Sequence, residues 1–106
     1  MSGAESTTRA RAAVRHLLES PTLAERCRPM LAGDEVDWAA LLAEAQTMSG
    51  GEQRLVHIAH ELWAGHAYVG LSELARGLDR SSFERVVAAL RLFRGDVQAP
   101  AARLAA

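Results

Sequence analysis

The chain has 106 residues, of which 49% are hydrophobic and 24% are charged, and its formal net charge at pH 7 is -1. These values are typical of one globular domain and exclude an intrinsically disordered chain. The near-zero net charge excludes a global electrostatic field that would attract nucleic acid or anionic lipid. No stretch approaches the roughly 20 apolar residues of a membrane span, and residues 1–8 lack the apolar core of a secretory signal, so we expect a cytoplasmic protein.

In chain order, residues 1–6 are expected to be a disordered N-terminus, and a first helix is predicted over residues 8–19. Its apolar positions Ala10, Val14, Leu17 and Leu18 recur at helical spacing and define one buried face.

The pair Ser20-Pro21 predicts a second helix over residues 21–31, because serine is a preferred N-cap and proline is tolerated at the first helical position. Pro29 lies inside this pattern and should kink or end the helix near Arg28. Residues 30–32 would then add one more turn before Gly33. The single cysteine, Cys27, excludes an internal disulfide. Its neighbours Arg26 and Arg28 could activate the thiol, but we expect a small buried apolar residue.

Residues 33–35 predict a turn, and Asp37 is the expected N-cap of a helix over residues 38–46. Val36 before this cap and Leu41 after it are placed to form a hydrophobic staple. No strand-like alternation of useful length occurs; Tyr68 to Gly70 is the only candidate, and it is too short to stand alone.

Two segments fit the capping box, in which a serine side chain and a glutamate three residues later each accept a backbone N–H bond. They are Ser49 to Glu52 and Ser81 to Glu84. They predict helices over residues 50–64 and 82–94, which close on Gly65 and Gly95. The first should bury Leu55, Ile58, Ala59, Leu62 and Trp63, and the second Phe83, Val86, Val87, Leu90 and Phe93.

Between these two helices, a short helix is expected near residues 72–77, with Leu74 and Leu78 facing inward. The fold class is therefore all-α, a compact bundle of about five helices plus this short one. One helical domain would span residues 7–95, followed by a flexible tail over residues 96–106.

Charge is unevenly distributed along the chain. Residues 9–28 contain five arginines and two glutamates, residues 34–61 six acids and one arginine, and residues 76–94 five arginines and two acids. Such blocks are usually solvated helix faces, but basic ends and an acidic middle could also pair between two chains.

Residues 48–54, Met-Ser-Gly-Gly-Glu-Gln-Arg, resemble the LSGGQ signature loop of ABC ATPases. In that family the loop presents backbone N–H groups to a γ-phosphate. The chain contains neither a P-loop nor any lysine, so we read these residues as the capping box alone. A metal site built from His57, His60, Glu61 and His66 would be a half-site at best, because H-E-x-x-H is absent. We therefore expect no metal, no cofactor and no catalytic residue.

The order of elements over residues 52–94 is that of a helix-turn-helix, and Leu71 to Arg76 resembles the start of that motif in winged bacterial repressors. The resemblance implies that the last helix contacts DNA through its N-terminal residues. By position these contacts would come from Arg80, Ser81, Ser82, Arg85, Arg91 and Arg94. The turn is about two residues shorter than usual and no β-wing follows.

The interpretation that we favour is a small helical module for protein–protein interaction or regulation, without catalytic activity. Its apolar stripes are generous for so short a chain, so one could be left for another protein or a second copy of itself. DNA remains the alternative partner. We expect no membrane association and no small-molecule substrate.

Overall fold

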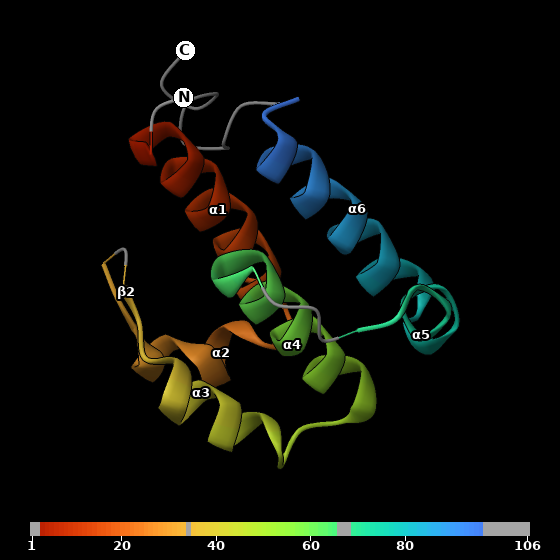
Figure 1. Cartoon of the computed structure of the whole chain (residues 1–106). Coiled ribbons are helices and arrows are strands. Elements are labelled where there is room, and N and C mark those ends of the chain that lie inside the picture. Colours follow the sequence, from red (N-terminus) through yellow and green to blue (C-terminus); the bar gives the residue numbers. More distant parts are fainter. Residues whose placement is uncertain (1–2, 34, 66–68, 97–106) are drawn as a thin grey trace.

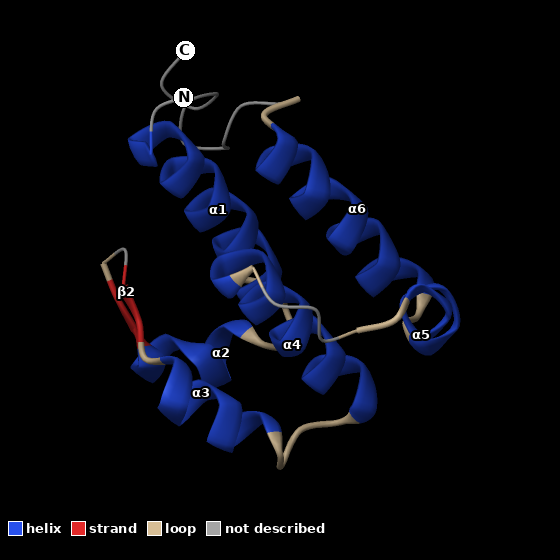
Figure 2. Cartoon of the chain, in the orientation of Figure 1, coloured by secondary structure: helices blue, strands red, loops and turns tan. Residues whose placement is uncertain are grey.

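The computed structural model describes residues 3–33, 35–65 and 69–96 (Figure 1). Within these ranges the elements follow in the order α1 (Gly3–Leu18), α2 (Ala24–Cys27), the 3-10 turn η1 (Arg28–Met30), β1 (Leu31–Ala32), β2 (Glu35–Val36), α3 (Trp38–Ala45), α4 (Gly50–Ala64), α5 (Leu71–Gly77) and α6 (Arg80–Arg94). Figure 2 shows how small the strands are beside the helices, and the predicted all-α bundle is confirmed. No helix of the described ranges is both long enough and apolar enough to cross a bilayer.

Helix α4 lies at the centre of the bundle and contacts α1, α3, α5 and α6. Helices α1 and α6 make the most extensive contact. They run antiparallel, since Arg9 in the first half of α1 bonds the end of α6 while Arg85 in the first half of α6 bonds the last turn of α1. In Figure 1, α3 and α5 lie on opposite sides of α4. The core between these helices contains mainly leucine, valine and alanine side chains, among them Leu17, Leu41, Leu55, Val56 and Val86.

The start of α4 confirms the first capping box. The Glu52 N–H donates to Ser49 Oγ at 3.2 Å, and the Ser49 N–H donates to Glu52 Oε1 at 3.1 Å. Gly65 ends the helix in the left-handed region at φ 80°, which a side chain would strain. Asp37 also caps α3 as predicted, through a bond from the Ala40 N–H at 3.2 Å.

The second predicted capping box is wrong. Helix α6 begins at Arg80, and its N-cap is Asp79, whose Oδ1 accepts the Ser82 N–H at 2.7 Å. An aspartate also interacts favourably with the positive end of the helix dipole, so it competes well with a serine two residues later. The backbone and side chain of Ser82 hold the pKa of Asp79 below its ordinary value. The predicted end at Gly95 is confirmed, with φ 87°.

The first third of the chain departs most from the prediction. Helix α1 already begins at Gly3, so residues 3–6 are helical, while residues 1–2 lie outside the described ranges. Residues 21–23 form a turn instead of a helix start, and α2 has only four residues. The Ser20 carbonyl closes this turn by accepting the N–H groups of Leu23 and Ala24 at 2.8 and 2.9 Å. The turn places Leu23 and Cys27 in the core, where both are fully buried.

Pro29 ends α2 as predicted, but the extra helical turn expected over residues 30–32 is wrong. Leu31 and Ala32 instead pair with Val36 and Glu35 in a short antiparallel hairpin. Gly33 adopts φ 61° at the hairpin turn, where Asp34 lies outside the described residues. Tyr68 and, apart from Asp96, the predicted tail also lie outside them.

Candidate functional site

Helix α5 is a short surface helix that Arg54 of α4 attaches to the bundle. None of its residues is buried, and its N-cap Gly70 offers no side-chain cap. Arg54 of α4 donates from Nη1 to the Gly77 carbonyl at 3.1 Å, and its Nε lies 3.8 Å from Glu73 Oε2. A Cβ on Gly77 would lie 2.6 Å from Arg54 Nε, so the glycine permits this close approach.

Beneath α5 an apolar groove opens between α4, α5 and α6. Its volume is about 150 Å³, half the lower limit of about 300 Å³ for small-molecule pockets, so it has room for one or two side chains. The Glu61 carboxylate is its single charged group and accepts the Val69 N–H at 3.1 Å. The groove is lined by Ile58, Glu61, Leu62, Val69, Leu71, Leu74, Val86 and Leu90.

Large apolar side chains are exposed along this groove. Leu71 is 83% exposed at its edge, and Leu90 and Phe93, one turn apart on α6, are each 38% exposed. The expectation that α6 buries both residues is therefore wrong, because the described helices cover each side chain only in part. Val86 is buried, whereas Phe83 and Val87 are partly buried. We call the groove, together with Leu71, Leu90 and Phe93, the α5–α6 face.

Most arginines are engaged inside the molecule. Four donate to backbone carbonyls of other elements, where helix ends and turns leave acceptors unsatisfied. They are Arg9 to Arg94 O at 3.3 Å, Arg15 to Gly33 O at 2.9 Å, Arg54 to Gly77 O at 3.1 Å and Arg85 to His16 O at 2.7 Å.

Three arginines of the described chain have neither a hydrogen bond nor an ion pair: Arg76 in α5, and Arg80 and Arg91 in α6. All three are exposed. The positive charge left free for a partner is therefore concentrated on α5 and α6.

The residues predicted to contact nucleic acid are divided by the structure. Arg80, Ser81 and Arg91 are exposed on α6, whereas Arg85 is bonded to α1 and Arg94 pairs with Asp96 at 3.2 Å. The remaining residue of that set, Ser82, donates its backbone N–H to the side chain of Asp79, the N-cap of α6. Helices α4, α5 and α6 do follow in helix-turn-helix order, with Leu78 and Asp79 between the last two. DNA contact by this set remains a prediction.

The side chains that were weighed as metal ligands, without a metal being expected, have different neighbours in the structure. The His60 ring lies 4.7 Å from Trp38, which lies 6.0 Å from Trp63. Glu61 points to the groove, and His66 is outside the described residues. The described part of the chain has no group of three or more candidate metal ligands.

Cys27 is buried, as predicted, and burial raises its pKa to about 11. Its thiol is therefore protonated and inaccessible at neutral pH.

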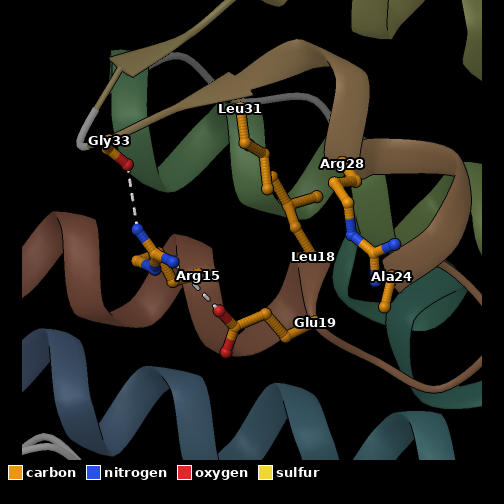
Figure 3. Close-up of a pocket in the computed structure, with 7 residues that line it drawn as sticks. All are labelled: Arg15, Leu18, Glu19, Ala24, Arg28, Leu31 and Gly33. Atoms are coloured by element: carbon orange, nitrogen blue, oxygen red, sulfur yellow. Dashed lines mark hydrogen bonds and ion pairs between the residues drawn. The ribbon is translucent and has the colours of Figure 1, made fainter.

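A second hollow of about 310 Å³ lies beside the hairpin, where Arg15 and Arg28 face across Leu18 and Leu31 (Figure 3). Both guanidinium groups already have partners. Arg15 bonds Gly33 O and pairs with Glu19 at 3.3 Å, and Arg28 pairs with Glu25 at 3.2 Å. This hollow therefore offers a ligand little uncompensated charge.

Comparisons with protein-family models, curated proteins and solved structures found no match to the chain.

Proposed function

We propose that the chain is a non-catalytic protein–protein interaction module that binds a partner on the α5–α6 face. The observation that carries this proposal is that the exposed large apolar side chains of the described residues, Leu71, Leu90 and Phe93, all belong to that face. Single exposed apolar residues are ordinary on any protein surface. Here Leu71 and Leu90 line one groove, and Phe93 extends the same strip by a turn.

The dimensions of the groove favour a protein partner over a small molecule. A volume of about 150 Å³ accepts one or two apolar side chains, as an interface hot spot does. Helix α5 has no buried residue, so its side chains are available for contact without unfolding the core. Such a module would act by bringing proteins together, in line with the regulatory function predicted above.

Site-specific photocrosslinking in the native host tests this proposal. A photoreactive phenylalanine analogue at Leu71 or at Phe93 should give one discrete adduct, whereas the same analogue at exposed Ala43 of α3 should give none. A second change, Leu90→Ser, should abolish both adducts. Equal adducts from all three positions, or none from any, would refute docking on this face. An adduct of twice the 11.4 kDa chain mass identifies a second copy as the partner.

One observation favours the second candidate, DNA binding through residues 52–94: the free arginines Arg76, Arg80 and Arg91 could contact phosphates. DNA binding would not, however, explain the apolar groove between α4 and α6. A labelled DNA duplex at low salt separates the two functions. Docking predicts no binding, whereas binding that weakens with salt and with Arg91→Ser, but not with Arg28→Ser, would favour DNA.

A further inference from the structure

Helix α5 has few of the interactions that keep a helix folded. It has seven residues, fewer than the ~12–15 that an isolated helix needs in water. Gly70 at its N-cap has no side chain to accept a helix N–H, and none of the seven residues is buried. Helix α4, in contrast, has a capping box and four buried residues. The stability of α5 therefore depends on its contacts with the bundle.

The main contacts of α5 within the described ranges come from one apolar side chain and one guanidinium group. Leu74 is partly buried and packs against the core. Arg54 donates to the Gly77 carbonyl at 3.1 Å and lies 3.8 Å from the Glu73 carboxylate, so one side chain of α4 holds two positions of α5. The side chain of Arg54 is 33% exposed and that of Glu73 is 51% exposed, so water can replace both contacts without opening the core.

We propose that α5 is a lid over the apolar groove, that Arg54 holds it closed, and that it opens as a unit while the rest of the bundle stays folded. Helix α5 contributes no buried residue to the core, so its departure leaves the core packed. The chain after the lid is fixed, because Leu78 is buried and Asp79 caps α6. The movement is therefore confined to α5 itself.

Opening of the lid uncovers the floor of the groove. Ile58 and Val86 line the groove but are only 6% and 1% exposed. When Leu74 leaves with α5, both side chains face solvent. The apolar surface then extends from the exposed rim to this floor, and the groove is larger than the 150 Å³ of the closed state. If the proposed function holds, the lid regulates how much of the docking face a partner can reach.

Hydrogen exchange of the intact protein, followed for each amide by NMR, tests the opening. The N–H groups of residues 74–77 bond within α5, the first from Leu74 to the Gly70 carbonyl at 2.9 Å. Their protection factors should be similar to one another and about a hundredfold or more below those of residues 55–59 in α4, because a lid opens without global unfolding. Equal protection of α5 and α4 would refute the lid.

Two variants test the contact with Arg54. Arg54→Ala removes it and should lower the protection of residues 74–77 about tenfold, with α6 unchanged. Gly77→Ala places a Cβ 2.6 Å from Arg54 Nε and should lower this protection about threefold, although alanine is the better helix former. In the Arg54→Ala background the clash is absent, so Gly77→Ala should instead raise the protection about threefold.

Gly51→Ala in α4 is the matched control, since nothing lies within 4 Å of its added Cβ. It should leave the protection of α5 unchanged. If Arg54→Ala has no effect on α5, or if Gly77→Ala changes the protection in the same direction in both backgrounds, Arg54 does not hold the lid and the inference is wrong.

Thiol labelling tests whether the opening reaches the groove. The Val86→Cys variant carries one thiol on the groove floor and the native Cys27, which is fully buried in the core. Arg54→Ala should speed labelling at position 86 about tenfold and leave Cys27 unchanged, as peptide mass spectrometry would measure. Equal acceleration at both thiols would mean that the whole fold opens, and no acceleration at position 86 would mean that α5 does not cover the groove; either result refutes the lid. These experiments need no partner, so the lid can fail while docking stands.

Discussion

The molecule has an inner region, made of α1, α4 and the side of α6 that faces α1, and an outer region, made of α5 and the side of α6 that carries Leu90 and Phe93. Both contain leucines, arginines and a serine near a helix start. In the inner region these side chains have partners inside the chain, whereas in the outer region several have none. Residue composition is thus a poor guide to function here. The side chains that lack a partner inside the chain indicate the surface that is left for another molecule.

The largest expected effect compares two leucines of α6. Leu92 is 5% exposed, so Leu92→Ala should reduce the free energy of unfolding by about 2–4 kcal/mol through lost burial and a residual cavity. Leu90 is 38% exposed, and Leu90→Ala should cost about 1 kcal/mol or less. Urea denaturation of both variants measures the difference. Equal losses would mean that the outer side of α6 is as well packed as the inner side.

Two arginines of α6 provide a second comparison. Arg85→Met leaves the His16 carbonyl without its charged donor and should cost about 1–3 kcal/mol. Arg91→Met removes a side chain without an internal partner and should change stability by no more than about 0.5 kcal/mol. The same denaturation experiment applies. A costly Arg91 change would show that this arginine has a structural function and is not free for a partner.

The two helix starts give a smaller contrast. Ser49→Ala removes the N-cap of α4 and should cost about 1 kcal/mol. Ser81→Ala should be within about 0.5 kcal/mol of the parent, because Asp79 caps α6. Thermal unfolding followed by circular dichroism is sufficient to measure both. If Ser81→Ala lowered the melting temperature as much as Ser49→Ala, the cap assigned to Asp79 would be incorrect.

The smallest effect is a pH dependence in the inner region. Burial, and next the charge of Arg85, lower the pKa of His16 below 6.5, although Glu19 acts in the opposite direction. Because the unfolded chain binds the proton more tightly, neutral His16 contributes to the stability of the folded state. This contribution is complete above pH 6.5 and decreases as the pH falls towards the folded pKa. Unfolding titrations from neutral to mildly acidic pH should show a smaller decrease for His16→Gln. An identical decrease in both proteins would assign it to other groups.

Local signals predicted much of the fold. The capping box at Ser49, the N-cap Asp37, the proline that ends α2 and the glycines after α4 and α6 all lie where the sequence placed them. Each signal acts through backbone hydrogen bonds or dihedral angles within a few residues, so all the interacting groups can be identified from the local sequence.

The failures arose where two local signals compete. Asp79 and Ser81 can each cap a helix, and in the structure Asp79 is the N-cap. Ser20-Pro21 reads as a helix start, but burying Leu23 and Cys27 required a turn there instead. Tertiary packing overrides propensity when the alternatives differ by only about 1 kcal/mol.

The candidate site was only partly accessible to sequence reasoning. A surplus apolar stripe was expected, and Leu74 and Leu78 were predicted to face inward without Leu71. Periodicity nevertheless assigned Leu90 and Phe93 to the core, and both are exposed. The free arginines could not be identified either, because Arg9 and Arg85 bond carbonyls 85 and 69 residues away in the chain.

By itself the sequence determined an all-α bundle, the ends of its best-marked helix and the residue types available to each face. The tertiary structure decided which apolar stripe is covered and which arginines are occupied. The physical reason is range: capping and periodicity act within one or two turns, whereas burial and charge pairing depend on which distant segments meet.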